Sequence, residues 1–281
     1  MKKVKQRIPA KINLTLDVSN LTDGYHPIRS IVCSVDIYDT VILKKRKDCL
    51  ITLKEKGIKS GCPIEENNAV KAVAKYMESF GVCGANIVLK KGIPVGAGLG
   101  GSSADVAGTL ILMEKLYGKN ANVKEIADTL GSDTGYMTIG GLKVISGRGE
   151  VVENINASLD AFLIVLTDSE PISTKACYAN FDKLGSKPTC TEKALKALES
   201  GEKETFARLI KNDLYAPAVN FLPRLKTKIN DLKKAGATTA LMTGSGSAVY
   251  GLFLNQKQRD FAYKILRKKY KNSIIKAKTL G

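Results

Sequence analysis

One segment of this sequence carries a clearer structural signal than any other: Pro94-Val95-Gly96-Ala97-Gly98-Leu99-Gly100-Gly101-Ser102-Ser103-Ala104. Four of the six residues from Gly96 to Gly101 are glycine, so backbone N–H groups can approach an oxyanion without obstruction by side chains. A helical pattern follows at 104–117, and the N-terminal end of a helix attracts anions. Ser102 and Ser103 are expected to cap that helix and to offer hydroxyls to a phosphate or a magnesium ion. The segment is therefore predicted to be a phosphate-binding loop.

Two familiar nucleotide motifs do not describe this loop. No Gly-Lys-Ser/Thr closes it, as a Walker A loop requires. No acidic residue ends a second strand roughly 20 residues on, as a dinucleotide-binding fold would have. A tight turn without a ligand is the remaining alternative, and the two serines that open a strong helix favour phosphate binding over it.

Composition is that of a soluble globular chain with room for two domains. The chain has 281 residues, of which 44% are apolar and 25% are charged. No uncharged apolar run reaches about 18 residues, so no transmembrane helix is expected. The basic N-terminus begins like a signal peptide, but Lys11 and Asn13 interrupt the apolar stretch, so we predict a strand and a cytoplasmic protein. Six cysteines stand singly, without metal-site spacing, and are expected to be free thiols.

The net charge of +17 has two readings. Nucleic-acid binding is one of them. The other is a lysine-rich, solvated surface on a protein whose substrates are anionic. Lysines are spread along the whole chain, there is no tryptophan, and no aromatic residues are interleaved with the basic clusters at 44–47 and 267–269. We therefore predict a solvated surface, with no specific nucleic-acid partner and no membrane partner.

Periodicity predicts a mixed fold. Alternating β-branched stretches indicate strands near 4–18 and 30–54, and apolar residues at helical spacing indicate a helix over 67–80. The other expected helices are at 123–130, 191–199, 202–213, 223–235 and 256–269. The other expected strands are at 161–167, 239–243, 249–254 and within 140–153, where a turn at Gly147-Arg148-Gly149 joins them. Strands and helices do not alternate strictly, so the predicted class is α+β. We place the domains at 1–155 and 156–281.

The glycine-serine segment resembles the phosphate-binding motif of the GHMP kinase family. Two other segments resemble the first and third motifs of that family, AKINLTLDV at 10–18 and TALMTGSGSAVYGLF at 239–253. The resemblance implies two α+β domains with the active site in the cleft between them. It also implies phosphoryl transfer from ATP, with Mg²⁺, to the hydroxyl of a small molecule, with the loop at 243–247 closing over the nucleotide.

The same resemblance assigns the catalytic residues. Lys11 becomes a cation of the catalytic site, Asn13 a substrate contact, and Asp133 the general base that takes the proton of the acceptor hydroxyl. Strand alternation places Lys11 and Asn13 on one face, where a solvent-facing lysine is the plain alternative. For Asp133 the alternative is a helix-terminating turn within Leu130-Gly131-Ser132-Asp133-Thr134-Gly135.

The nucleotide contacts follow from the resemblance as well. Asn68 is placed at the adenine, although a helix N-cap would equally account for it. Ser102 or Ser103 is the candidate ligand of Mg²⁺. The predicted ATP-binding set is Asn68, Pro94, Gly96, Ala97, Gly98, Leu99, Gly100, Gly101, Ser102, Ser103, Ala104, Gly244 and Ser245.

Further segments resemble one branch of the family, which acts on a cytidylyl alcohol. These segments are DGYHPIRSIV at 23–32, LGSDTG at 130–135, PISTKACY at 171–178 and NDLYAPAV at 212–219. The resemblance implies that Tyr25 stacks on the cytosine, that His26 hydrogen-bonds to it, that Tyr178 forms the second aromatic wall and that Thr174 contacts the substrate. A loop hydrogen bond is the alternative for His26, the only histidine of the chain.

The sequence departs from this branch at two places. Ser102 stands where relatives have glycine and Ala104 where they have a second serine. The residues Thr134-Gly135-Tyr136-Met137 replace a common Val-Pro-Phe-Phe run and are expected to change the packing behind Asp133 or the shape of the acceptor site. Two rival functions therefore remain: a GHMP kinase for another small alcohol of the homoserine or mevalonate type, and a non-catalytic nucleic-acid-binding relative.

Overall fold

The chain folds into two units, each assembled from three stretches, in a computed structural model that describes residues 2–184 and 190–281. The first unit comprises Met1–Ala10, Ile37–Val95 and Gly100–Gly140, and the second comprises Lys11–Asp36, Gly96–Leu99 and Gly141–Gly281. Residue 1 and residues 185–189 of these ranges lie outside the described residues. The units are discontinuous in sequence because the long strands β1 (Lys3–Asn13) and β3 (Ile28–Lys45) each continue from one unit into the other.

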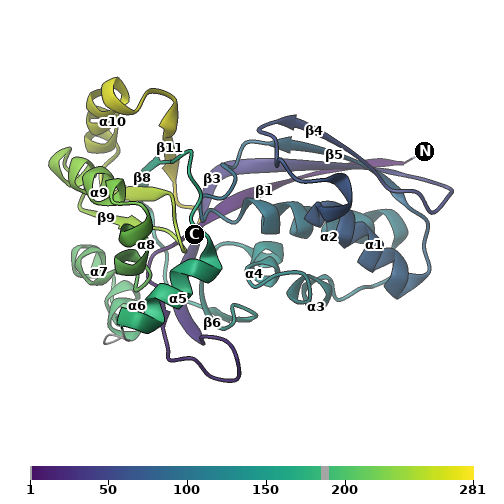
Figure 1. Ribbon diagram of the computed structural model, residues 1–281, viewed down its shortest axis with the longest axis horizontal. Coiled ribbons are helices and arrows are strands. Elements are labelled where there is room, and N and C mark those ends of the chain that lie inside the picture. The colour runs from purple at the N-terminus through teal and green to yellow at the C-terminus, as the bar shows by residue number, and fades with distance from the viewer. Residues whose placement is uncertain (1, 185–189) are drawn as a thin grey trace. The chain divides into compact units, whose positions relative to one another are not determined.

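The first unit packs helices on one face of a sheet (Figure 1). Strand β4 (Thr52–Gly57) pairs in parallel with β5 (Ala85–Lys91), and β5 pairs antiparallel with the Thr40–Lys45 part of β3. The helical elements of this unit are η1 (Ile64–Glu66), α1 (Asn68–Phe80), α2 (Gly101–Tyr117), α3 (Val123–Asp128) and α4 (Thr134–Ile139). The helix predicted over 67–80 is thus found as α1.

Helix α2 is the central helix of this unit. Every residue from Ala104 to Leu110 is buried, so this helix is enclosed on all sides, unlike an amphipathic surface helix. A Cβ atom at Gly108 would lie 2.7 Å from a methyl of Val41 and 2.9 Å from the side chain of Ile8. The glycine therefore allows α2 to lie directly against β1 and β3.

The second unit is built on an antiparallel sheet. Its strand order is β11 (Ile274–Lys278), β8 (Phe162–Leu166), β10 (Val249–Phe253) and β9 (Thr239–Met242). A hairpin of β6 (Leu142–Gly147) and β7 (Val151–Asn154) pairs with the Ile28–Cys33 part of β3, which also pairs with β2 (Asp17–Val18). The predicted strands of 140–153, joined by a turn at 147–149, are therefore confirmed.

Helices surround this sheet. They are α5 (Thr174–Leu184), α6 (Thr191–Glu199), α7 (Lys203–Leu209), α8 (Tyr215–Phe221), α9 (Arg224–Lys234) and α10 (Gln256–Tyr270), followed by η2 (Lys271–Ser273). The single helix predicted over 202–213 is wrong at its end, because α7 stops at Leu209. Asn212 instead forms a β-bridge with Leu16: the Lys211 carbonyl accepts from the Leu16 N–H, and the Asp213 N–H donates to the Leu16 carbonyl. Tertiary pairing with this segment thus overrides helical propensity there.

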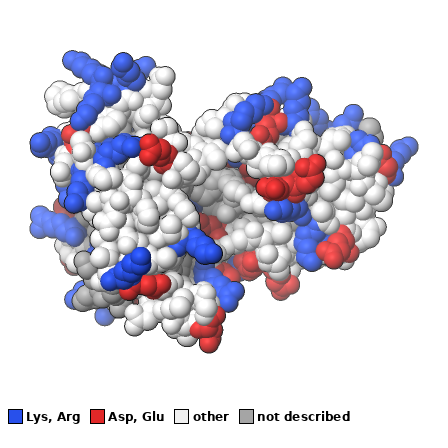
Figure 2. Space-filling view, in the orientation of Figure 1, with Lys and Arg blue, Asp and Glu red and all other residues white. Residues whose placement is uncertain are grey.

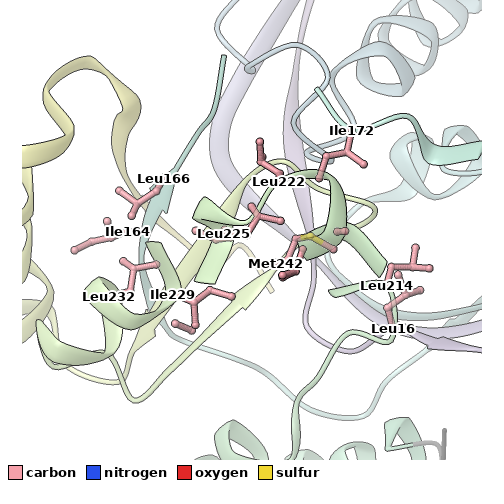
Figure 3. Packing of buried hydrophobic residues seen from close by; sticks show 14 of the residues in the cluster. Leu16, Ile164, Leu166, Ile172, Leu214, Leu222, Leu225, Ile229, Leu232 and Met242 are labelled. Carbon is pink, nitrogen blue, oxygen red and sulfur yellow. The ribbon is translucent and has the colours of Figure 1, made fainter. Parts of the chain in front are cut away.

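The core of the second unit lies between α9 and the sheet (Figure 3). Leu225, Ile229 and Leu232 recur at helical spacing along α9 and belong to one buried cluster with Ile164 of β8 and Met242 of β9. This packing holds β9, and therefore the segment that follows it, against a rigid scaffold.

The surface is rich in basic side chains. On the face shown in Figure 2, Lys and Arg lie scattered among acidic and uncharged residues and do not form one continuous patch. Within residues 2–184 and 190–281, no helix is long and apolar enough to cross a membrane.

A buried carboxylate anchors the segment after β8. Asp168 accepts hydrogen bonds from Lys228 at 2.7 Å and from the Arg224 guanidinium at 2.7 and 2.5 Å, and its side chain is only 4% exposed. The hydrogen bonds from Arg224, with those from Lys228 and the Glu170 N–H, outweigh burial and hold the pKa of Asp168 well below its usual range. Asp168 thereby joins the chain entering α5 to helix α9.

We predict that Asp168→Asn lowers the free energy of unfolding at pH 7 by on the order of 2 kcal/mol, since hydrogen bonds to a charged group are lost. Because the pKa of Asp168 is lower in the folded state than in the unfolded state, its carboxylate stabilises the fold fully above the unfolded pKa of 3.8. That stabilisation is lost as the pH falls through the folded pKa. The difference in the free energy of unfolding between wild type and variant should therefore be smaller at pH 3 than at pH 7, as measured by denaturant unfolding at both pH values. Asp48→Asn, which removes an exposed ion pair with Arg46, serves as control. An equal difference in the free energy of unfolding at both pH values would contradict the depressed pKa of Asp168.

Candidate functional site

Three sequence motifs meet at the hydroxyl of Thr243 in the second unit. This fully buried side chain accepts a hydrogen bond from the backbone N–H of Asn13 at 3.0 Å and donates one to the Gly98 carbonyl at 3.4 Å. The N–H of Lys11 donates to the Leu99 carbonyl at 3.0 Å, and the N–H of Ala248 donates to the Ala97 carbonyl at 3.2 Å. The segments at 10–18, 96–99 and 243–248 are therefore held together by main-chain geometry.

Gly98 sits where these segments are closest. Its φ is +76°, and a Cβ atom there would lie 2.4 Å from the Thr243 carbonyl oxygen and 3.1 Å from that of Gly246. Both the backbone conformation and the spacing therefore require glycine. Gly96 is exposed and Gly98 is half-buried, while Ala97 and Leu99, which alternate with them, are buried.

A side chain that the sequence did not single out supports the third motif. Asn212 donates from its amide nitrogen to the carbonyls of Met242 and Gly244, at 2.8 Å each. The only signal for this role was its place in the segment NDLYAPAV. On the other side of the loop, the hydroxyls of Ser245 and Thr174 are 2.9 Å apart. A predicted ATP contact and a predicted substrate contact are therefore neighbours.

Lys11 and Asn13 lie on one face of β1, as alternation predicted. The ammonium of Lys11 donates to the Asn13 side-chain oxygen at 2.7 Å, and the Asn13 amide donates to the Ser30 hydroxyl at 2.8 Å. The two residues are only 4% and 2% exposed, so the alternative of a solvent-facing lysine is wrong. Burial with polar partners fixes the direction of both side chains.

In the first unit, helix α2 begins differently from the prediction. Its N-cap is Gly100, with φ of +74° and no side-chain cap, so the expected capping by Ser102 and Ser103 is wrong. The helix begins earlier than expected because the glycine itself adopts the cap conformation. The two serines therefore lie in the first turn, where their hydroxyls stand beside the N–H groups of the helix end.

Asn68 is brought to the same place. The N-cap of α1 is Asn67, whose side-chain oxygen accepts from the Ala69 N–H at 3.0 Å, so the capping alternative for Asn68 is wrong. Asn68 is the first residue of the helix, and its amide donates to the Ser102 hydroxyl at 2.6 Å. The predicted adenine contact is therefore adjacent to the predicted phosphate contact.

Asp133 directly precedes α4 and is partly exposed. Its carbonyl accepts from the Met137 N–H at 3.1 Å, and its side chain makes no capping hydrogen bond to this helix. Thr134, Tyr136 and Met137, part of the run that departs from the family pattern, are all buried. These three residues therefore lie in the interior directly after Asp133, and the expected change in packing or in the shape of the acceptor site stays a prediction.

The aromatic residues predicted to hold the base contact other side chains of the protein. The ring of Tyr178 stacks on His26, with centroids 5.3 Å apart and planes at 27°, and Phe181 meets His26 edge-on at 5.8 Å. The Arg148 guanidinium lies 4.0 Å from the centroid of the Tyr25 ring. The sequence indicated only a turn at Arg148, because a cation–π contact leaves no local pattern.

The ring nitrogens of His26 already contact protein atoms. Nδ1 lies 2.8 Å from the carbonyl oxygen of Ser19, which can only accept, so Nδ1 carries a proton. Nε2 lies 3.2 Å from a carboxylate oxygen of Asp182. The loop hydrogen bond that was the alternative for His26 is therefore present, and a bond to a base would have to replace the contact with Asp182.

A family model for the GHMP kinase N-terminal domain matches residues 67–143, and a model for the GHMP kinase C-terminal region matches residues 194–272. A 4-diphosphocytidyl-2-C-methyl-D-erythritol kinase of Caldanaerobacter subterraneus subsp. tengcongensis is 37% identical over 95% of this chain and 94% of its own length. The enzyme of the same name from Macrococcus caseolyticus is 35% identical, over 91% of this chain and 92% of its own length.

The chain belongs to the GHMP kinase family. It is an ATP-dependent small-molecule kinase with a mixed α and β fold. A crystal structure of 4-(cytidine 5'-diphospho)-2C-methyl-D-erythritol kinase superposes with a TM-score of 0.85 and 28% sequence identity, covering 99% of this chain and 100% of that one. The two family models fall on either side of residue 155, where we predict the domain boundary.

We predict that Gly100→Val weakens ATP binding by this GHMP kinase about tenfold or more, because a branched residue is strained at φ of +74° and displaces the N–H groups at the start of α2. Gly118→Val is the matched control, since Gly118 caps the other end of α2 with φ of +61° and open space around it. Calorimetric titration of folded variants with ATP measures the effect. Equal ATP affinity in the two variants would remove this loop from the nucleotide site.

Proposed function

We propose that this kinase transfers the γ-phosphoryl group of ATP to the 2-hydroxyl of 4-diphosphocytidyl-2-C-methyl-D-erythritol, a step of non-mevalonate isoprenoid precursor biosynthesis. The names of the relatives that match nearly the whole chain support this acceptor. The observation that carries it is the ring cluster of His26 and Tyr178. The two rings come from different segments of the chain, each of which resembles the cytidylyl branch, and they stack within the second unit, which also holds residues 11–18, 96–99 and 239–253 of the three motifs.

The nucleotide is proposed to bind along the glycine-serine loop. Gly96, Gly98 and Gly100 all have positive φ, which turns successive backbone N–H groups toward a common side and suits polyphosphate oxygens. Asn68 is proposed to contact the adenine, and the loop of Gly244 and Ser245 to cover the phosphates. Accessible N–H groups at fixed positions stabilise negative charge without reorganising during the reaction.

Asp133 is the proposed general base and Lys11 the proposed cation of the catalytic site. The acceptor hydroxyl oxygen attacks the γ-phosphorus, its proton passes to the Asp133 carboxylate, the bond from phosphorus to the bridging oxygen breaks, and ADP leaves. The hydrogen bond from Lys11 to Asn13 directs the ammonium along the β1 face, so that its charge occupies a fixed position. Catalysis by such a site rests chiefly on positioning and charge neutralisation.

Mg²⁺ is the expected metal. The described residues contain no group of three or more His, Cys, Asp or Glu side chains that could hold a metal ion. This fits Mg²⁺, which binds through few protein ligands together with phosphate oxygens and water and neutralises the phosphates when bound. Asn68 already donates to the Ser102 hydroxyl, so we propose Ser103 as the serine that faces the metal.

The acceptor is proposed to bind beside the third motif. Thr174 opens α5 next to Ser245, and Tyr178 lies one turn further along the same helix. Tyr25 is proposed to stack on the cytosine with one face of its ring, while Arg148 covers the other face of the same tyrosine ring. Asn13, held by Ser30, offers a polar contact to the erythritol portion.

A panel assay tests the acceptor. ATP consumption would be followed with the cytidylyl substrate, mevalonate, homoserine and galactose, each at saturating concentration. Turnover confined to the cytidylyl substrate is the expected result. Faster turnover with a smaller alcohol would overturn the acceptor and leave the kinase assignment standing.

We predict that Asp133→Asn still binds both substrates but lowers kcat by about 10²–10⁴-fold, the range typical for loss of a general base. Asp128→Asn, in α3 of the same unit, is the matched control and should keep wild-type kcat. Steady-state kinetics together with calorimetry separate turnover from binding. Retention of wild-type kcat in the Asp133 variant would exclude it as the base.

We predict that Tyr25→Ala and Tyr178→Ala each raise the KM for the cytidylyl substrate about fivefold or more, because an aromatic stack contributes ~1 kcal/mol. The KM for ATP should stay unchanged, since adenine is proposed to bind beside Asn68. Tyr263→Ala, which removes a ring of α10 covered by Arg267 and Lys276, is the control. Unchanged kinetics in both variants would show that these rings do not hold the base.

A further inference from the structure

A buried group of three charged side chains lies where β5 ends and α2 begins, within the first unit. The ammonium of Lys91 bonds to Asp39 Oδ2 at 2.6 Å and to a carboxylate oxygen of Asp105. The side chains of Lys91, Asp39 and Asp105 are 3%, 0% and 6% exposed. The mechanism above uses none of them.

The group connects both ends of the phosphate-binding loop. Asp39 Oδ1 accepts from the N–H groups of Gly92 and Ile93, at 2.7 and 2.9 Å, immediately before Pro94. Lys91 reaches from the last residue of β5 to Asp105, which lies just after the first turn of α2. A Cβ atom at Gly101 would lie 3.7 Å from Asp39 Oδ2, so this carboxylate sits beneath the first residue of that helix.

The arrangement is not one that stability alone would favour. Two carboxylates share one ammonium, and Asp105 Oδ1 is buried with no hydrogen-bond partner among the described residues. Buried ionic groups of this kind often contribute less to stability than apolar side chains of the same volume.

We infer that Asp105, acting through Lys91 and Asp39, is a positioning residue that sets the start of α2 relative to the end of β5 and thereby the geometry of the phosphate-binding loop. A loop that is fixed at both ends presents its N–H groups at fixed positions. A displacement of about 1 Å in such a site can reduce the reaction rate by about two orders of magnitude. The inference rests on the proposed role of the loop in binding ATP, and not on the identity of the acceptor.

Asp105→Leu tests this inference because it leaves one positive charge, on Lys91, paired with one negative charge, on Asp39. It also removes Asp105 Oδ1, the buried oxygen with no hydrogen-bond partner among the described residues. We expect a denaturation midpoint equal to or above that of wild type, a Kd for ATP raised about fivefold to twentyfold, and an unchanged KM for the acceptor. Asp105→Asn keeps an oxygen for Lys91 and should restore the affinity to within about threefold. Thr109→Val is the matched control, since Thr109 lies one turn further along α2 and its hydroxyl is also buried with no partner among the described residues.

Wild-type ATP affinity in folded Asp105→Leu would overturn the inference, as would an equal loss in Asp105→Asn. Asp105→Ser, which is too short to reach Lys91, is the second variant should the leucine protein fail to fold. Failure of both to fold would assign the residue to stability and overturn the positioning role. Gly100→Val, titrated with ATP in parallel, separates the role of the loop in ATP binding from the positioning role of Asp105. Loss of ATP binding in Gly100→Val, but not in Asp105→Leu, would reject only the role of Asp105.

Discussion

The arrangement of the second unit's functional segments depends on one hydroxyl group. Thr243 Oγ1 receives the N–H of Asn13 and donates to the carbonyl of Gly98, so a single buried side chain connects three segments that are far apart in the sequence. The connection works only because Gly98 has no Cβ atom, which would otherwise collide with the main chain of Thr243. Because buried polar groups must be paired, neither strand nor loop can shift without leaving an unsatisfied partner. The site is therefore built chiefly from backbone geometry.

Charge is used differently in the two units. In the second unit the ammonium of Lys11 donates a hydrogen bond to the Asn13 side chain, two residues along the same strand. In the first unit Lys91 lies between two carboxylates, those of Asp39 and Asp105, which come from different elements. The contact of Lys11 directs its side chain along β1, whereas the contacts of Lys91 join β5 to β3 and α2.

The third motif depends on support from outside itself. Asn212 holds the carbonyls of Met242 and Gly244, while α9 packs against the strand that precedes the loop. This explains why residues 211–213 form a bridge and a turn where a helix was predicted. Their main chain pairs with Leu16, which brings Asn212 within reach of the loop. Support of the third motif thus requires residues 211–213, whose sequence favours a helix, to adopt a non-helical conformation.

The sequence by itself determined the glycine-rich segment, the helix that follows it and the shared face of Lys11 and Asn13, because glycine spacing and period-two alternation are local properties. The resemblance of three motifs identified the kinase family. The sequence also contained a pattern that predicts a buried lysine. Ala85, Ile87, Leu89 and Lys91 alternate toward the buried face of β5, so Lys91 required a buried partner. The partners themselves, Asp39 and Asp105, and likewise the stacking of Tyr178 on His26 and of Arg148 on Tyr25, were decided only by the tertiary structure. Such contacts join residues far apart in the chain, and their distances depend on packing that no local pattern encodes.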